Sequence, residues 1–299
     1  MAAANVRDRP IEDIRFFEAS ARAGNDLANK KREDIIIDIL NRIIPNRYFI
    51  HNQQWRLLKT ELERYLYDTF QIDDWSAITA IKKAGRGHHS DIELRYARSN
   101  SILTYHIEWK FGASKITECP QFVSPAKPNK YMTEPYDVYH YDNFLEEICT
   151  TMEEEKPDKD TYLREINRPY PPCISSLQQK YYKGATGSSQ CSGEAIDIAR
   201  TAYCKQISKK SIRQFFEKVE LNKETLNEYL RKSQKNKHYM LYSAGSLYHD
   251  IHTVEDYMIV SVEKKAPYFI CTTKSGKTLK ILLRWKNGNG IAYPAFQIK

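Results

Sequence analysis

Two short stretches of the sequence place two carboxylates and a lysine at a spacing that suits metal-dependent chemistry. SDIELRYAR, residues 90–98, carries Asp91, and LTYHIEWK, residues 103–110, carries Glu108 and Lys110. Apolar and polar residues alternate in both stretches, which predicts two β-strands with the three charged side chains on one sheet face. Two carboxylates on neighbouring strands, with a backbone carbonyl beside them, offer the oxygen ligands that Mg²⁺ and Mn²⁺ prefer.

The segment ARSN between the two strands predicts an antiparallel hairpin. We expect Tyr96 to face Ser101 across this turn. Asp91 then lies opposite His106 and diagonal to Glu108, about 7–8 Å away at the backbone, which is close enough for two carboxylates to reach one ion. Such an ion could bind a phosphate oxygen and activate a water molecule, and the lysine on the same face could orient that water.

The motif HSDIEL…IEWK resembles the D-(x)n-E-x-K core of the PD-(D/E)xK, restriction-endonuclease-like nuclease superfamily, with Ser90 where the family name has a proline. The resemblance covers mainly residues 25–111. It implies a core of one helix, a three-stranded meander, a second helix and a further strand. The segments 75–85 and HYMLYSAG, residues 238–245, are the expected first and last strands of that core.

The resemblance also implies roles for single residues. Asp91, Glu108 and the carbonyl of Trp109 would bind Mg²⁺, for which Mn²⁺ can substitute. Lys110 would orient the nucleophilic water. Glu33 would be the glutamate that many members of the superfamily carry on the first helix, facing the site.

Two alternatives for the site remain open. On the first helix, Asp34 and Asp38 compete with the glutamate for a place in the site. Further along the chain, Glu263 and Lys265 repeat the Glu-x-Lys spacing at the end of an apolar run, with Asp256 upstream. Charged residues on the wet face of a half-buried strand also occur without any catalytic role.

The composition narrows the class of protein. With 299 residues, 41% of them hydrophobic, the chain can bury the core of one large domain or two modest ones. The six cysteines show no C-x-x-C spacing, which argues against a zinc ribbon and a disulfide framework. Because no stretch approaches the roughly 20 apolar residues of a membrane span, and no secretory signal begins the chain, we expect an intracellular protein, cytoplasmic, nuclear or viral.

The net charge of +8 and the pI of about 9.0 point to a polyanionic partner. Basic residues precede the predicted hairpin and recur near the C-terminus, where Trp285 and an NGNG turn could approach a nucleic-acid backbone. Another basic segment, CKQISKKSIRQ, is expected on a solvent-exposed helix face. The residues expected to contact nucleic acid are Lys82, Lys83, Arg86, Lys277, Arg284 and Lys286.

The order of elements predicts an α/β (mixed α+β) fold: a restriction-endonuclease-like core, in which helices flank a central mixed sheet, plus a C-terminal β-rich region. Helices are expected at 25–43, which Pro45 ends, and at 55–70. The four expected segments are 1–111 with the N-terminal helices and the meander, 112–192 as a Pro/Tyr/Ser-rich insertion, 193–245 with helices and the last core strand, and 246–299 as a β-rich, DNA-binding accessory region.

These patterns predict a Mg²⁺-dependent phosphodiesterase, a restriction-type endonuclease acting on double-stranded DNA. An RNA nuclease, or a DNA-repair or junction resolvase of the same fold, is one alternative. A non-catalytic nucleic-acid-binding protein is another, although acidic groups that face phosphate bring no gain to a pure binder. A homodimer is compatible with each of these functions.

Overall fold

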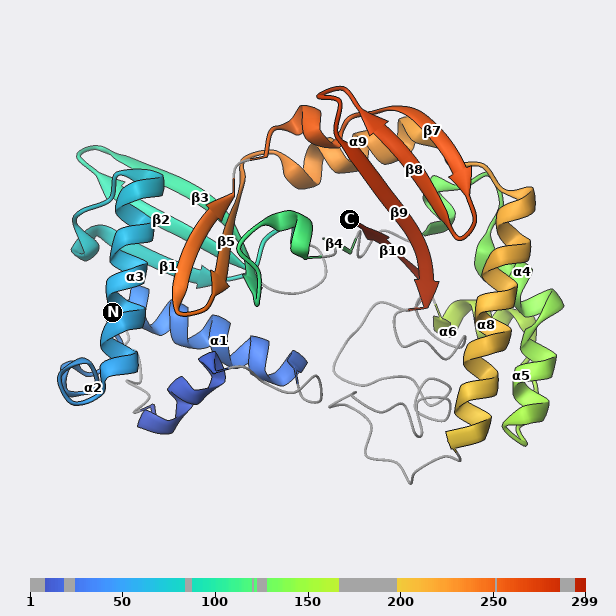
Figure 1. Cartoon of the computed structure of the whole chain (residues 1–299), viewed down its shortest axis with the longest axis horizontal. Coiled ribbons are helices and arrows are strands. Elements are labelled where there is room, and N and C mark those ends of the chain that lie inside the picture. Colours follow the sequence, from blue (N-terminus) through green and yellow to red (C-terminus); the bar gives the residue numbers. More distant parts are fainter. Residues whose placement is uncertain are drawn as a thin grey trace. The chain divides into compact units, whose positions relative to one another are not determined.

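The computed structural model describes residues 9–18, 25–83, 88–119, 121–122, 128–166, 198–250, 252–285 and 294–299. The fold is mixed α/β, as the sequence predicts. The chain divides into two compact units, drawn in Figure 1. The first unit comprises Met1–Cys119 and Lys235–His252, and the second unit comprises Pro120–Gln234 and Thr253–Lys299.

The first unit is built on a mixed five-stranded sheet in the order β1-β2-β3-β5-β6. Strands β1, β2 and β3 form an antiparallel meander, β5 runs parallel to β3, and β6 returns antiparallel to β5 (Figure 1). The elements of this unit are η1 (Ile11–Phe17), α1 (Asn25–Leu40), α2 (Asn46–His51), α3 (Gln53–Phe70), η2 (Trp75–Ala77), β1 (Ile78–Lys82), β2 (Ile92–Arg98), β3 (Ser101–Phe111), η3 (Ile116–Glu118), β5 (Lys237–Ser243) and β6 (Ser246–Asp250).

Local sequence signals explain where the first helices begin and end. The side chain of Asn52 accepts hydrogen bonds from the backbone N–H groups of Gln54 and Trp55, at 2.9 and 3.2 Å, which caps the start of α3. Gln71 ends that helix in a left-handed conformation, with φ 56°. Helix α1 is shorter than predicted because the chain turns at Arg42, with φ 59°.

Helices α1 and α3 cover one face of the first sheet. Alternate strand residues, such as Ile92 on β2 and Ile107 on β3, are fully buried against apolar helix residues such as Ile36 and Leu62. Burial of each such side chain stabilises the folded state by about 1.5–3 kcal/mol, because its apolar surface is removed from water. Because successive strand residues point to opposite faces, this buried pattern turns the side chain of Glu108 to the other face.

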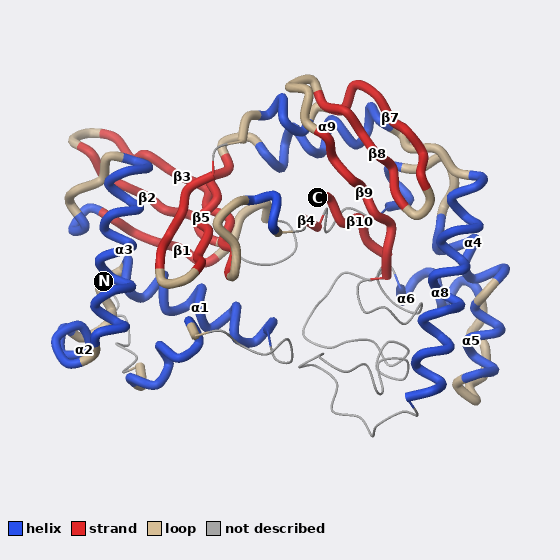
Figure 2. The backbone as a smooth tube through the Cα atoms, in the orientation of Figure 1, coloured by secondary structure: helices blue, strands red, loops and turns tan. Residues whose placement is uncertain are grey.

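The second unit holds an antiparallel sheet in the order β4-β10-β9-β8-β7, whose strands are coloured red in Figure 2. Among the helices that the structure describes in the whole chain, none is long and apolar enough to cross a membrane. The elements of this unit are β4 (Gln121–Phe122), η4 (Pro128–Tyr131), α4 (Tyr136–Asn143), α5 (Leu145–Thr151), α6 (Lys159–Ile166), α8 (Ile198–Lys218), α9 (Lys223–Gln234), η5 (Val254–Tyr257), β7 (Ile259–Lys265), β8 (Tyr268–Thr273), β9 (Thr278–Trp285) and β10 (Pro294–Ile298).

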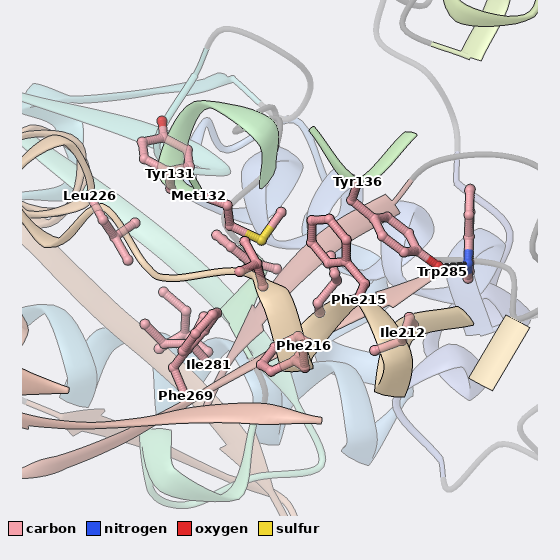
Figure 3. Close-up of a cluster of buried hydrophobic side chains, with 14 of the residues drawn as sticks. Tyr131, Met132, Tyr136, Ile212, Phe215, Phe216, Leu226, Phe269, Ile281 and Trp285 are labelled. Carbon is pink, nitrogen blue, oxygen red and sulfur yellow. Dashed lines mark hydrogen bonds between the residues drawn. The ribbon is translucent and has the colours of Figure 1, made fainter. Parts of the chain in front are cut away.

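Aromatic side chains dominate the core of the second unit (Figure 3). Phe216 of α8 packs against Phe269 of β8, with ring centroids 4.6 Å apart. Trp285 is 2% exposed, and its indole N–H donates a hydrogen bond to the Tyr136 hydroxyl at 2.8 Å. The prediction that Trp285 approaches nucleic acid is therefore wrong, because the alternation of β9 turns this side chain into the core.

The division of the chain differs from the four predicted segments. Helices α8 and α9 belong to the second unit, and strand β6 belongs to the first sheet rather than to a C-terminal region. Within the predicted insertion, residues 128–166 form helices that pack in the second core. Apolar periodicity shows that a helix has a buried face but not which sheet covers it, and this is why the boundaries were misplaced.

Candidate active site

A tight hairpin between β2 and β3 brings the predicted residues together. Tyr96 pairs with Leu103, two residues beyond the predicted partner. The turn is shorter than predicted because Ser99 adopts a left-handed conformation, with φ 52°, and two residues suffice to reverse the chain. This shift in register places Asp91 opposite Glu108. Because the register shifts by two residues, an even number, every side chain stays on its predicted sheet face.

Backbone hydrogen bonds fix the carboxylate of Asp91 at the end of β2. Its N–H donates to the carbonyl of Ile107 at 3.0 Å, and its Oδ2 accepts from the N–H of Trp109 at 2.9 Å. In a strand, the N–H and C=O of one residue point to the same edge. The carbonyl of Trp109 therefore points towards the edge on which the Asp91 carboxylate lies, as the predicted metal site requires.

Glu108 lies between two lysines. Its Oε1 accepts a hydrogen bond from Lys110 Nζ at 2.6 Å, and its Oε2 accepts one from Lys237 Nζ at 3.2 Å. The three side chains are partly buried, and 15% of the surface of Glu108, 23% of that of Lys110 and 8% of that of Lys237 is exposed. The carboxylate predicted to bind metal therefore has an ammonium group on each oxygen.

Lys237 is a residue of the candidate site that the sequence did not reveal. It begins β5, which pairs in parallel with β3, and it is 129 residues away from Glu108 along the chain. No local pattern marks it, since other lysines, Lys232 and Lys235, come shortly before it. Burial lowers the pKa of His89, and the positive charge of Lys237 lowers it further. The imidazole ring of His89 is therefore close enough to the candidate site to feel its charges.

Glu33 of α1 is near enough to the hairpin for its charge to act on Asp91, whereas its two competitors pair elsewhere. Its buried Oε2 pairs with Lys82 Nζ at 3.4 Å but accepts no hydrogen bond of good geometry among the described residues. Burial raises the pKa of this carboxylate, and the charge of Lys82 acts in the opposite direction. Asp34 pairs with the same Lys82 at 2.7 Å, and Asp38 pairs with Arg9 at 2.7 Å. Of the three acidic residues, the predicted glutamate is the one with a buried oxygen that accepts no hydrogen bond.

The two hairpin carboxylates have opposite pKa shifts. Burial raises the pKa of Asp91 to about 7, and the negative charges of Glu108 and Glu33 act in the same direction. Burial also opposes the ionisation of Glu108, but the charges of Lys110 and Lys237 outweigh it and hold its pKa below the ordinary value. The site thus gathers more buried negative charge than its two lysines balance, which a bound cation would relieve.

The donor set fits a hard divalent cation. Carboxylates of Asp91 and Glu108, with the Trp109 carbonyl, supply oxygen ligands, and the unbonded Glu33 oxygen lies in the same region. No group of three His, Cys, Asp or Glu side chains in the described ranges is arranged to hold a metal by itself. The third ligand of the proposed set is a backbone carbonyl, and an ion that binds Glu108 has to displace one of its lysines.

The described basic residues that were predicted to contact nucleic acid already contact side chains of the protein. Arg86 and Lys286 lie outside the described residues. The other four contacts are Lys82 with Asp34, Lys83 with Glu93 at 3.2 Å, Lys277 with Asp256 at 3.1 Å, and Arg284 with Gln297 at 2.8 Å. The structure thus places two of these residues in each unit, none of them on a purely basic patch.

The competing Glu-x-Lys pair lies on the surface of the second unit. Glu263 and Lys265 pair with each other at 3.0 Å on β7, and their side chains are 61% and 58% exposed. Asp256, upstream of them, pairs with Lys277 instead. This arrangement brings together no second carboxylate, and it lacks the burial that strengthens electrostatic interactions at the hairpin.

Comparison with known proteins assigns the chain to no family. No family model matches the sequence, and a search of curated proteins finds no match either. The case for an active site therefore depends on the geometry of the hairpin, α1 and β5.

Proposed function

We propose that the protein is a Mg²⁺-dependent nuclease, a restriction-type endonuclease that acts on double-stranded DNA inside a cell. The observation that carries the proposal is the meeting of Asp91, Glu108 and Lys110 on one face of the first sheet, near Glu33 of α1. The order of elements also supports it: helix α1, the meander β1-β2-β3 and the parallel strand β5 are similar to the core that the resemblance implies.

In the proposed mechanism, Asp91, Glu108 and the Trp109 carbonyl would hold the cation. Mg²⁺ bound there would offset negative charge on the phosphate and on the leaving oxygen. Lys110, once released from Glu108, would donate a hydrogen bond to the attacking water and orient it towards phosphorus. The water oxygen forms a bond to phosphorus and gives up one proton to bulk water, the bond from phosphorus to the leaving oxygen breaks, and the leaving oxygen takes up one proton from bulk water.

The buried carboxylates favour catalysis over pure binding. A protein that only binds nucleic acid needs positive charge, and three acidic groups facing a phosphate would weaken its affinity. RNA hydrolysis and junction cleavage use the same phosphodiester chemistry, so they remain alternatives that the choice of substrate separates.

The test is hydrolysis of plasmid, linear duplex DNA, single-stranded DNA, four-way junctions and RNA, each with and without Mg²⁺. Asp91→Asn, Glu108→Gln and Lys110→Ala should each lower the rate at least about 100-fold. Glu263→Gln and Lys265→Ala change the matched surface pair and should leave the rate largely unchanged. Ca²⁺ should support binding without efficient cleavage.

Three results would contradict the proposal. Full activity in excess chelator would exclude the metal mechanism. Inactive Glu263 and Lys265 variants, with active hairpin variants, would move the site to the second unit. If the parent protein hydrolyses none of these substrates, the binding-protein alternative replaces the nuclease.

A further inference from the structure

Lys237 occupies a place that a second metal ion would need. Its side chain is 8% exposed, and its Nζ lies 3.2 Å from Glu108 Oε2. Strand order places it across β3 from Asp91, since β2 lies on one side of β3 and β5 on the other. A cation on the Asp91 side of Glu108 leaves this contact intact, whereas a cation on the β5 side has to displace it.

Burial makes this ammonium group costly to release. A buried charge is stable only while it is paired, and Glu108 is the acidic side chain that the described residues pair with Lys237. Lys110 is different, because its side chain is 23% exposed and the negative charges of both Glu108 and Asp91 act on it. Of the two lysines, Lys110 is therefore the one that can leave Glu108 when a cation binds.

The charges of the site favour one divalent cation over two. When ionised, Asp91, Glu108, Glu33 and Asp34 carry four negative charges, and Lys110, Lys237 and Lys82, which pairs with Glu33 and Asp34, carry three positive charges, which leaves −4 + 3 = −1. One divalent cation brings the sum to +1, which one phosphodiester charge cancels. Two cations would bring it to +3 and leave +2 after the phosphate had bound, a large uncompensated charge in a buried site.

We propose that Lys237 stands in for a second metal ion, so that the active site binds one divalent cation per chain. The inference rests on the proposed function, since it concerns the same site. In this arrangement Lys237 is a positioning residue: it neutralises and orients Glu108 Oε2, while Oε1 exchanges Lys110 for the cation. Removing the ammonium group vacates the β5 side of Glu108 and opens a second cation position.

The experiment is calorimetric titration of the full chain with Ca²⁺, which reports the number of bound ions without turnover. The sites that count are those that Glu108→Gln abolishes, because Glu108 is the ligand common to both cation positions. The parent should show one such site and Lys237→Met should show two. Lys235→Met, an exposed lysine in the turn just before β5, is the matched control and should show one. The Mg²⁺ dependence of cleavage should rise with a Hill coefficient near one in the parent and near two in Lys237→Met.

The number of bound Ca²⁺ ions tests the inference about Lys237 and the nuclease proposal separately. Two Glu108-dependent sites in the parent, or one in a folded Lys237→Met, would overturn the inference and leave the nuclease proposal standing. No Glu108-dependent site in the parent would overturn both. If Lys237→Met fails to fold, Lys237→Gln removes the charge and keeps a polar group, and the stoichiometry of the parent is decisive by itself.

Discussion

Asp91 and Glu108 carry the same chemical group, but the protein treats the two charges differently. Burial raises the pKa of Asp91 to about 7, whereas two lysines overcome burial at Glu108 and hold its pKa down. One carboxylate is compensated in the metal-free protein and the other is not. Substitution of the two residues should therefore change stability in opposite directions.

Asp91→Asn should stabilise the metal-free protein by about 1–3 kcal/mol at pH 8, because the amide removes the repulsion by Glu108 and Glu33 and can still accept from Trp109 N–H. The gain should appear as the pH rises from about 4 to 7. In that window the folded parent keeps a proton on Asp91 that the unfolded chain has released, so the parent loses stability. Urea unfolding in chelator measures the change.

Glu108→Gln should instead destabilise the protein by about 3 kcal/mol, because it leaves the ammonium group of Lys237 without its counter-charge and Lys110 with Asp91 alone. The exposed control Glu263→Gln should stay within about 0.5 kcal/mol of the parent. Ca²⁺ at about 100 times its Kd should add about 2.7 kcal/mol to the parent and nothing to Asp91→Asn. Destabilisation by Asp91→Asn would contradict this account of the site.

The sequence predicts the residues of the hairpin because their pattern is local. Alternation with period two is enough to place Asp91, Glu108 and Lys110 on one face, and an error of two residues in register leaves that face unchanged. The contact of Lys237 with Glu108 spans 129 residues and depends on how β5 adds to the sheet. Tertiary pairing of this kind leaves no periodic trace in the sequence.

At the scale of single elements, helix α8 carries exposed basic residues that form no ion pair within the described part of the chain. Lys205, Lys209 and Arg213 recur every four residues, are exposed, and form no ion pair within the described part of the chain. Residues four apart on a helix lie on one face, about 6 Å apart along the axis. The segment predicted to be an ordinary solvated face therefore presents a row of cations.

If the protein binds DNA through phosphate contacts, this row should contribute more than the β9 residues. Changing Lys205, Lys209 and Arg213 to Gln should lower the slope of log Kd against log salt by about 2–3, since each phosphate contact contributes about 0.9. Changing Lys277 and Arg284 to Gln should lower the slope by less than about 1, because both already contact side chains of the protein. Binding to a labelled duplex across a salt series measures both. A larger loss in the β9 variant would restore the original prediction.

A histidine pair between β5 and β6 should make the first sheet sensitive to acid. His238 Nδ1 and His249 Nε2 lie 3.3 Å apart, and Phe70 of α3 packs edge-on against His238 at 4.8 Å between ring centroids. Burial, with the charge of His249, lowers the pKa of His238 to about 4. The unfolded chain therefore binds a proton at higher pH than the folded protein does.

Stability should accordingly fall as the pH drops from about 6.5 to 4, and His238→Gln should flatten that fall by about 1–2 kcal/mol after allowance for solvent screening. His51→Gln, on the exposed end of α2, is the control and should leave the pH profile unchanged. Thermal unfolding at a series of pH values gives the comparison. An unaltered profile in the folded His238 variant would show that the pair does not titrate as its packing indicates.

At the scale of the whole molecule, the first unit is assembled from two separate pieces of chain. Residues 1–119 supply β1, β2 and β3, and residues 235–252 supply β5 and β6. Amphipathic patterns predicted the type of most elements, but they could not predict this division. An apolar helix face packs equally well on any sheet with a matching surface, so the assignment of α8 and α9 to the second unit depends on three-dimensional packing.

The fragment 1–119 should not fold stably by itself. It lacks the buried Met240 and Leu247, together worth about 3–6 kcal/mol, and it leaves β3 as an unpaired edge. A chain of 1–119 joined to 235–252 by a flexible linker should fold and retain the Asp91-dependent Ca²⁺ site. Near-ultraviolet circular dichroism and tryptophan fluorescence, with Trp109 buried in the core, distinguish the two. A cooperatively folded 1–119 would contradict the role given to β5 and β6.

The parallel pairing of β3 with β5 also has a consequence for synthesis. Because 129 residues separate Glu108 from Lys237, the ribosome completes β3, the strand of the proposed site, about 6–26 s before β5, the strand that supports it, at about 5–20 residues per second. Throughout that interval the nascent chain carries the Asp, Glu and Lys of the motif on an incomplete sheet. A polypeptide released before residue 237 would therefore contain the whole motif and lack the lysine and strand that hold it in place.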